Sequence, residues 1–317
     1  MHPHEHNPLG LPPQLPLARY RFDILLEDPL ILPEYAGSTL RGVFGHALRR
    51  AACMTRQPEC HGCMLHDSCP YPRLFAAHGG NGLNRSQQHT PPQAYIIEAP
   101  DDGRRHYRPG EHYRFEMVLT GHARHQLPLI AHSFKQAFAR GITAARSRGG
   151  LAQIAVETPA GWQGIFSGSH IQPHPDTLTL PQHYPDSATL HIRTPLRLQH
   201  QGSVLGIHRV RADILLRQLM RRVSSIATLY WQHPIRADFG RLAQAARQVD
   251  SRPQLQWHDW TRYSNRQQQA MTLGGLTGHW HLAQLPPAFA QLLYLGQWLH
   301  IGKETTFGLG RYHLQNS

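Results

Sequence analysis

The residues with the clearest chemical potential lie in one short part of the chain. His46 stands in the segment GSTLRGVFGHALRR at 37–50, and all four cysteines follow within 53–69. Histidine is the side chain whose unperturbed pKa lies nearest to neutral pH, so it can both accept and donate a proton. Closely spaced thiols can hold a metal ion. This region therefore raises two questions: what His46 does, and what the cysteines hold.

The segment around His46 has the periodicity of an amphipathic helix, which we expect over 37–52. Its apolar residues recur every three or four positions and form one stripe. His46 lies off that stripe, so we expect it on the exposed face with Gly42, Arg49 and Arg50. A solvated histidine without a role is the competing interpretation, because the chain has 25 histidines. The stripe consists of Leu40, Val43, Phe44, Ala47, Leu48 and Ala51.

The cysteines have the spacing C-x6-C-x2-C-x5-C, which favours metal ligation over disulfides in a chain without an export signal. A structural zinc is the first interpretation, since four thiolates suit tetrahedral zinc and the insertion has few apolar residues to fold it. An iron–sulfur cluster, weakly indicated by Pro70, and unliganded thiols are the alternatives. A site closed by four cysteines leaves no open position for catalysis. The predicted ligands are Cys53, Cys60, Cys63 and Cys69.

The composition indicates a polyanionic partner. Lys and Arg total 32 against 20 Asp and Glu, a formal charge of +12, and only Lys135 and Lys303 are lysines. A GC-rich genome would explain the excess of arginine over lysine, but not the net charge. Arginine binds phosphate through a flat fork of donors and stacks on bases. Nucleic acid is therefore the leading partner class.

The N-terminal segment MHPHEHNPLGLPPQLP has no apolar stretch typical of a signal peptide. No run of about 18 apolar residues, as a membrane span needs, occurs in the sequence. We therefore expect a disordered leader at 1–16, a cytoplasmic protein, and no membrane partner.

Hydrophobic periodicity predicts the order strand, helix, strand, strand, helix, strand twice along the chain. Two such units in tandem indicate an α+β fold of two ferredoxin-like, or RRM-like, βαββαβ domains. We expect the N-terminal domain at 17–168 with a cysteine-rich insertion at 53–75, a linker at 169–187 and the C-terminal domain at 188–317. The expected elements are 18–29, 37–52, 94–100, 111–121, 127–142 and 151–159, then 188–198, 211–231, 256–264, 271–283, 286–300 and 310–315.

Three stretches of the second half have the composition of a nucleic-acid surface. The glycine-rich loop at 302–310 can bring backbone amides close to a phosphate, although a plain turn is the alternative. The segment WHDWTRYSNRQ at 257–267 interleaves aromatic and basic side chains, as binding of unpaired bases requires. We expect the helix at 211–231 to expose arginines. The predicted contacts are Arg193, Arg197, Arg211, Arg217, Arg221, Arg222, Arg262, Arg266, Gly302, Lys303, Gly308, Gly310 and Arg311.

Five motifs together resemble one known family. STLRGVFGHALRR, the cysteine cluster ending CPYPRLF, TPLRL, DWTRYSNRQ and GKETTFGLGRYHL occur in its order and with its character. The chain thus resembles the CRISPR-associated endoribonucleases of the RAMP superfamily (Cas-six), in a subgroup with a four-cysteine insertion. The resemblance covers nearly the whole chain past residue 17 and implies tandem ferredoxin-like domains. It also implies a metal-independent cut within CRISPR repeat RNA that leaves a cyclic phosphate and a 5′-hydroxyl.

The resemblance implies an active site in the first domain, with His46 as the proton-transfer residue and Tyr35 as a second participant. Arg49 or Arg41 would fill the cationic role that other members give to lysine, and Arg50 would add phosphate binding. Guanidinium groups there would neutralise charge growing on the phosphate and favour the neutral imidazole. The implied partners are CRISPR repeat RNA, mature guide RNA and a CRISPR effector complex.

Two other functions stay open at this point. A non-catalytic RAMP subunit could hold guide RNA in an effector complex, but it would have no need of a histidine on the first helix. A cysteine–metal regulator could bind DNA, but no recognition helix is predicted after the cysteines. A metal-dependent nuclease is disfavoured because no cluster of carboxylates stands out.

Overall fold

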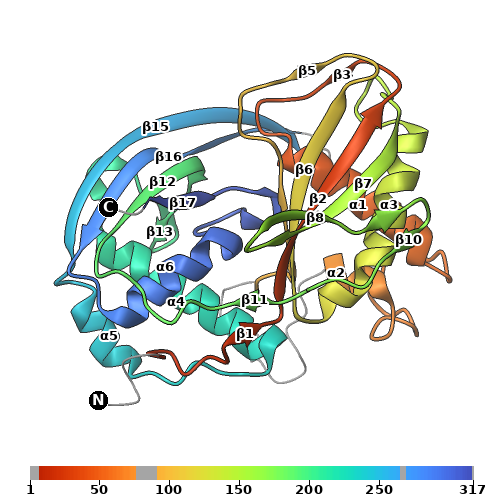
Figure 1. Ribbon diagram of the computed structural model, residues 1–317. Helices are drawn as coiled ribbons and strands as arrows, with labels where there is room; N and C mark the ends of the chain where they lie inside the picture. Colours follow the sequence, from red (N-terminus) through yellow and green to blue (C-terminus); the bar gives the residue numbers. More distant parts are fainter. Residues whose placement is uncertain (1–6, 76–90, 265–268, 316–317) are drawn as a thin grey trace. The chain divides into compact units, whose positions relative to one another are not determined.

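The computed structural model describes residues 7–75, 91–264 and 269–315. It divides the chain into two compact units, shown in Figure 1. The N-terminal unit is Pro16–Leu178, and the C-terminal unit is Thr179–Ser317 together with the residues up to Leu15. Among the described residues, no helix combines the length and apolar character that crossing a bilayer requires. Strands β1 (Gln14–Leu15) and β11 (Leu178–Thr179) fall where the chain passes from one unit to the other.

The N-terminal unit is built on a five-stranded antiparallel sheet in the order β4-β6-β2-β7-β8. Helices α1 and α3 lie side by side on one face of it (Figure 1). The main elements are β2 (Leu17–Leu26), α1 (Gly37–Ala52), β4 (Tyr95–Glu98), β6 (His112–Thr120), α3 (Leu127–Arg140), β7 (Gly149–Thr158) and β8 (Gly161–Gly164). The shorter ones are β3 (Leu30–Ile31), α2 (Pro70–Phe75), β5 (His106–Tyr107), η1 (Gly121–Gln126), β9 (Phe166–Ser167) and β10 (His170–Ile171).

Aromatic side chains from both layers fill the core of this unit. Phe44 of α1 stacks on Phe134 of α3, with ring centroids 5.3 Å apart. Phe134 in turn contacts Phe22 of β2 and Phe115 of β6. All four rings are fully buried. This burial fixes the rotation of α1 about its own axis, and so decides which of its residues face away from the sheet.

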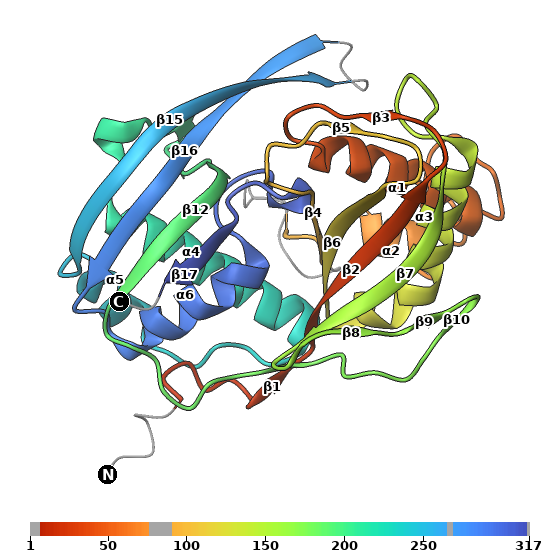
Figure 2. The same cartoon turned by 45° about the horizontal axis from the view of Figure 1, so that its top comes forward.

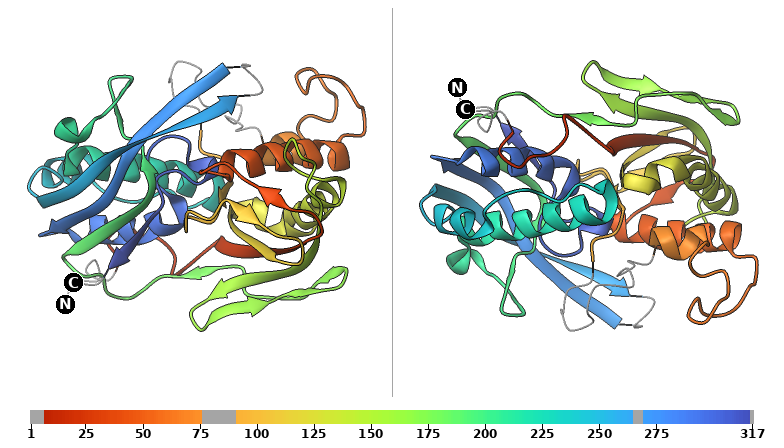
Figure 3. Two further views of the ribbon diagram at one scale, coloured as in Figure 1. Left: turned by 90° about the horizontal axis from the view of Figure 1, so that it is seen from above. Right: turned by 90° about the horizontal axis from the view of Figure 1, so that it is seen from below.

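The C-terminal unit has a four-stranded antiparallel sheet in the order β15-β16-β12-β17, with α4 and α6 packed together beside it (Figure 3). The main elements are β12 (Ala188–Leu196), α4 (Ala212–Ile226), β15 (Asp250–Ser264), β16 (Gln269–Ala283), α6 (Pro287–Leu299) and β17 (Tyr312–Gln315). The shorter ones are β13 (Gln199–His200), β14 (Ser203–Val204), η2 (Ile207–Arg209), η3 (Ala227–Trp231), α5 (Phe239–Ala245) and η4 (Thr305–Phe307).

The two sheets share one topology. Numbered within each βαββαβ unit, the strand order is fourth, first, third, second: β7-β2-β6-β4 in one unit and β17-β12-β16-β15 in the other. The prediction of two tandem ferredoxin-like units is thereby confirmed. The N-terminal unit adds β8 at one edge of its sheet.

The hairpin of β15 and β16 is longer than the sequence indicated. β15 begins at Asp250 rather than at residue 256, because Pro253 is tolerated on an edge strand. The pairing of β12 with β16 ends at Leu276, whereas β15 and β16 stay paired up to Ser264 and Gln269. The hairpin therefore continues past β12 as a two-stranded ribbon (Figure 2).

The prediction of a disordered leader at 1–16 is wrong for residues 7–15. Leu9, Leu11 and Leu15 are each at most 1% exposed. The backbone amide of Arg236 donates to the carbonyl of Leu9, and His233 Nε2 lies 2.6 Å from the carbonyl oxygen of Gly10. The proline-rich composition concealed three leucines that the C-terminal unit buries. Residues 1–6 lie outside the described part of the chain.

Candidate functional site

Helix α1 presents two different faces beyond its buried stripe. Gly42, His46 and Arg50 are exposed, and we call them the outer face of α1. Arg41, Gly45 and Arg49 are half-buried or buried and turn towards α2 and the segment 53–69, which we call the cysteine loop. These three are the loop face of α1. Each set has i, i+4, i+8 spacing, so the faces run parallel along the helix.

His46 stands in the middle of the outer face. It is exposed, as the sequence predicted, while Leu40, Phe44 and Leu48 are fully buried. One turn earlier, Gly42 has no atom within 4 Å of the position that a Cβ would occupy. The surface at Gly42, beside the imidazole, is therefore not covered by neighbouring side chains.

Arg49 does not share that face, which corrects the sequence-based expectation. Its Nη2 donates to the backbone carbonyls of Gln57 and Pro58, at 2.6 and 2.5 Å. Its guanidinium also lies 5.9 Å from the ring centre of Tyr71. The long side chain thus reaches the cysteine loop rather than the outer face of α1, and this position does not support the catalytic role predicted for Arg49.

Gly45 and Arg41 complete the loop face by packing against Phe75 of α2. A Cβ on Gly45 would lie 2.5 Å from Phe75 Cζ, so only glycine fits there without a shift. The Arg41 guanidinium lies 4.4 Å from the centre of the same ring, a cation–π contact. Arg41 therefore contributes to the packing of α2, and Arg50 is the arginine of α1 on the same face as His46.

Tyr35 lies in the loop that leads into α1 and is half-buried. Burial, and then the charges of Glu34 and Asp101, raise its pKa to about 12. The phenol therefore stays protonated at neutral pH and can donate a hydrogen bond, but it cannot accept a proton as a base. His46 is nine residues beyond Gly37, the start of α1, which corresponds to about 14 Å along the helix axis.

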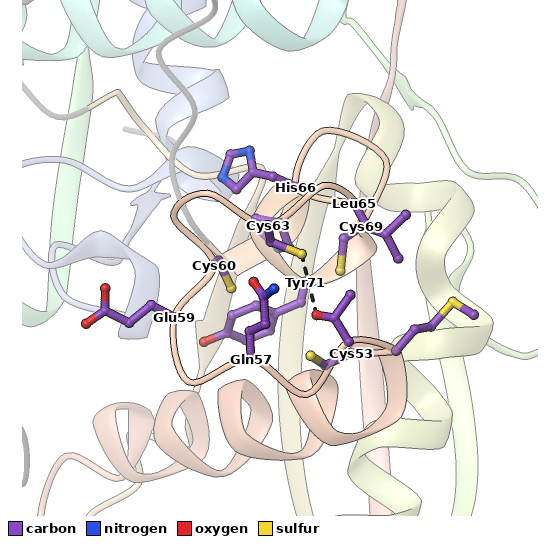
Figure 4. Close-up of a pocket in the computed structure, with 12 residues that line it drawn as sticks. Cys53, Gln57, Glu59, Cys60, Cys63, Leu65, His66, Cys69 and Tyr71 are labelled. Atoms are coloured by element: carbon purple, nitrogen blue, oxygen red, sulfur yellow. Dashed lines mark hydrogen bonds between the residues drawn. The ribbon is translucent and has the colours of Figure 1, made fainter.

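The four cysteines line one pocket in the cysteine loop, as Figure 4 shows. All four are free thiols. Cys63 Sγ lies 3.5 Å from the hydroxyl of Thr55, and this hydrogen bond is the main reason why the pKa of Cys63 is lowered. Among the described residues, no three His, Cys, Asp or Glu side chains form a ready-made metal-ligand set. The thiols surround a common space without converging on one point.

The arginines in and next to α4 differ in whether their guanidinium groups are bound within the protein or exposed. Arg217 donates to the carboxylate of Asp213 at 2.7 Å, and Arg211 donates to the same group at 2.8 Å. Arg222, expected on the exposed side, instead donates to a backbone carbonyl of α6, and burial lowers its pKa to about 10. Arg221 is exposed and fits the prediction of an outward arginine.

The glycine-rich loop is shaped by close packing inside the C-terminal unit. Gly310 has φ 71°, and a Cβ there would lie 1.8 Å from the carbonyl oxygen of Ile301. Its amide donates to Pro195 O, and the amide of Gly308 donates to Thr305 O. These two amides are hydrogen-bonded within the unit, and contact of the loop with RNA stays a prediction. The glycines allow the backbone segments to approach closely.

The basic residues around this loop fall into two groups. Arg197 donates to the carbonyl of Gly274, and its own carbonyl oxygen lies 2.6 Å from where a Cβ of Gly302 would be. Burial lowers the pKa of Arg197. Arg197 is thus part of the packing of the loop, and Arg311 is half-buried beside it. Arg193 and Lys303, by contrast, are exposed.

Residues 257–264 of the aromatic and basic segment belong to β15, and the rest of the segment lies outside the described residues. Trp257 is 39% exposed, donates through Nε1 to Asp259, and lies over Gly274. The backbone of Arg262 belongs to β15, whereas Arg266 lies outside the described residues.

Sequence reasoning missed a row of histidines across the C-terminal sheet. His191 of β12 is paired with His279 of β16 on one side and with His313 of β17 on the other. The rings of His191 and His279 stack at 4.4 Å between centroids. His281 Nδ1 lies 3.0 Å from the hydroxyl of Thr189 on the same face, opposite the buried leucines of these strands. Polar residues alternating with apolar ones in TLHI and GHWHL were the available signal.

Two ferredoxin-like units in tandem, with a glycine-rich loop before the last strand, define the class of the protein: it is a RAMP-type protein. Sequence comparison then gives the particular family. The family described as CRISPR-associated endoribonuclease Cas6 matches residues 190–312, and an N-terminal domain family matches residues 15–177. The match over residues 190–312 confirms the resemblance that the motifs predicted, to the CRISPR-associated endoribonuclease family Cas6.

Solved structures agree with this fold. A Cas6 product complex superposes with a TM-score of 0.58 at 14% identity, covering 94% of this chain and all of its counterpart. Thermus thermophilus Cas6 gives 0.52 at 13% identity, covering 95% and 99%. A partial Cas6-RT-Cas1–Cas2 complex gives 0.59 at 16% identity, with 98% of this chain aligned to 47% of a longer one. No curated protein sequence matches this chain.

Proposed function

We propose that this protein cleaves CRISPR repeat RNA to release guide RNA, with His46 transferring the proton and no metal ion at the scissile phosphate. One observation carries the proposal: an imidazole stands exposed on the first helix of a Cas6 chain, off the buried stripe and beside open space. A histidine that served only packing would have been buried with Phe44 and Leu48.

The reaction needs two proton movements around one phosphate. Neutral His46 would accept the proton of the ribose 2′-hydroxyl, whose oxygen attacks the adjacent phosphorus. The bond from phosphorus to the 5′-oxygen breaks, and that oxygen takes up a proton from water. The products are a 2′,3′-cyclic phosphate and a 5′-hydroxyl. Histidine suits the first step because its unperturbed pKa is close to neutral.

Arg50 and Tyr35 would have supporting roles. Arg50 lies one turn after His46 on the outer face, where its guanidinium can bind the negatively charged phosphate. Tyr35 lies two residues before Gly37, the start of α1, and Gly37 is itself about 14 Å from His46 along the helix axis. Since its pKa is raised to about 12, it would donate a hydrogen bond to a neighbouring nucleotide.

The RNA is expected to bind through the exposed cations and the histidine-bearing face of the C-terminal sheet. Arg193, Arg221 and Lys303 are exposed, and a formal charge of +12 gives long-range attraction. The histidine row adds stacking and hydrogen-bonding groups suited to unpaired bases. The relative titled as a Cas6 product complex supports this substrate class. The relative titled as a Cas6-RT-Cas1–Cas2 complex supports association with other CRISPR proteins.

The proposal is tested with CRISPR repeat RNA of the protein's host, incubated with the protein in EDTA. We expect cleavage with a cyclic phosphate on the upstream product, and none when the ribose at the cut carries a 2′-deoxy substitution. His46→Ala should lower the rate by about 10²- to 10⁴-fold. Cleavage of the deoxy substrate, or a strict need for magnesium, would reject the mechanism. Tight binding without any cleavage would indicate the guide-holding subunit instead.

A further inference from the structure

The cysteine loop has almost nothing of its own to hold it in place. It contains no helix or strand, and every residue from 53 to 69 is exposed or half-buried, with none fully buried. Its two methionines, Met54 and Met64, are 84% and 88% exposed. Ordering a segment of this length carries an entropic penalty that hydrophobic burial normally offsets. Another source of stabilisation is therefore needed.

All four thiols lie on the side of the loop that lines the pocket. Cys53, Cys60, Cys63 and Cys69 are half-buried and line the same pocket (Figure 4). The amide of Cys63 donates to the carbonyl of Cys60 at 3.2 Å, so the CHGC stretch forms a tight turn that carries two thiols. Two thiols on one turn are half of a tetrahedral thiolate site.

The other two thiols come from the ends of the neighbouring helices. Cys53 is the C-cap of α1, where its amide donates to the carbonyl of Arg49. Cys69 immediately precedes α2, and its amide donates to Leu65 O at 2.8 Å. A group bound by all four sulfurs would join the end of α1, the CHGC turn and the start of α2.

We propose that the four cysteines bind one zinc ion, which fastens the cysteine loop between α1 and α2. The sulfurs now have weak partners: Cys63 Sγ lies 3.5 Å from Thr55 Oγ1, and Cys69 Sγ lies 3.9 Å from the carbonyl oxygen of Ala52. Because no described set of three ligands is already converged, binding must draw the sulfurs inward. The loop has no buried side chain to oppose that movement. Zinc–thiolate bonds would then supply the missing stabilisation.

The zinc would also act on the loop face of α1. Arg49 donates to the carbonyls of Gln57 and Pro58, which lie in the loop between the first two cysteines. An ordered loop holds these acceptors in place, and with them the arginine. The zinc proposal concerns folding and is independent of the role proposed for His46.

The test uses the full-length chain without an affinity tag, expressed with zinc and dialysed before metal analysis. We expect about one zinc per chain, and intense sulfur-to-metal charge-transfer absorption when cobalt(II) replaces zinc. This absorption reports thiolate ligands, so it is not mimicked by metal bound to the many histidines. Cys63→Ser should lose the zinc and the absorption. His61→Ala, an exposed neighbour in the same turn that does not line the pocket, should keep both.

A second measurement covers a variant that fails to fold. Stripping metal from the wild-type protein should lower its melting temperature, and adding back zinc should restore it, whereas magnesium should not. A wild-type protein that takes up neither zinc nor cobalt through sulfur would overturn the proposal. So would retention of zinc by Cys63→Ser, or a preparation that contains iron and acid-labile sulfide in place of zinc.

Discussion

The outer face and the loop face of α1 have the same spacing and similar residue types. The outer face is nevertheless exposed, whereas the loop face packs against α2 and the cysteine loop. Both have a glycine, and both have an arginine at their last position. On the outer face nothing contacts the glycine position, and the arginine is exposed. On the loop face Phe75 covers the glycine, and the arginine is bound to two carbonyls. What surrounds a residue, and not its type or spacing, decides whether it is available for a ligand.

The two faces of α1 should also contribute differently to the stability of the folded protein. Residues of the outer face make few contacts, so changing them should leave the folded state nearly as stable as before. Residues of the loop face hold α2 and the cysteine loop, so changing them should act on stability first. Three substitution pairs test this division, beginning with the largest expected effect.

The first pair is His46→Ala and Arg49→Ala. His46→Ala should reduce cleavage by the factor given above, because the proton acceptor is lost, and should leave the melting temperature unchanged. Arg49→Ala should show the reverse pattern. It removes two hydrogen bonds to carbonyls and should lower the unfolding free energy by about 1 kcal/mol, a value reduced by solvent exposure.

Single-turnover cleavage and thermal melting of the same preparations measure both effects. Arg49→Lys serves as a control, since it keeps the charge but lacks the planar fork that reaches two carbonyls. If Arg49→Ala abolished cleavage at full stability, the separation of the two faces would be wrong, and Arg49 would belong to the active site after all.

The second pair is Gly45→Ala and Gly42→Ala. The new methyl at position 45 would lie 2.5 Å from Phe75 Cζ, and such overpacking destabilises by about 1–3 kcal/mol. At position 42 there is open space, so alanine should stabilise the helix by up to about 1 kcal/mol. Chemical denaturation at a fixed zinc concentration measures both. Equal effects of the two substitutions would contradict the packing of α2 on this helix.

The third pair is Arg50→Ala and Arg49→Ala, compared in RNA binding. Arg50 is exposed beside His46, so its loss should weaken binding and reduce the dependence of log affinity on log salt concentration by about 1. Arg49→Ala should leave that dependence unchanged, since its guanidinium is bound to the cysteine loop. Titration of labelled repeat RNA at several salt concentrations gives the slopes. An unchanged slope for Arg50→Ala would remove this residue from the RNA-binding surface.

The same contrast recurs in the C-terminal unit. Arg217 and Arg221 are one turn apart on α4, yet Arg217 is bound to Asp213 and Arg221 is exposed. The next residue, Arg222, is drawn inward to a carbonyl of α6. Counting arginines on a helix therefore overestimates its basic surface.

Hydrophobic periodicity was enough to predict the order of elements in both units and the exposure of His46. The helix expected at 37–52 has those bounds in the structure, and every expected strand is found, with ends that shift by a few residues. These features follow from local hydrophobic periodicity, which is written in neighbouring residues and is enforced by burial of one stripe or one face. The short helices α2 and α5 were not predicted, because six or seven residues show too little hydrophobic periodicity.

Which polar groups are available to a ligand depends on contacts that form only in the folded chain. The partners of Arg49, Arg197 and Arg222 are carbonyls from other segments, and the glycine-rich loop uses its amides for its own packing. The histidine row exists only because three strands are aligned in register. The hydrogen-bond partner of a long side chain or a backbone amide often comes from a segment that is distant in sequence. The residues next to it in the sequence therefore do not predict that partner.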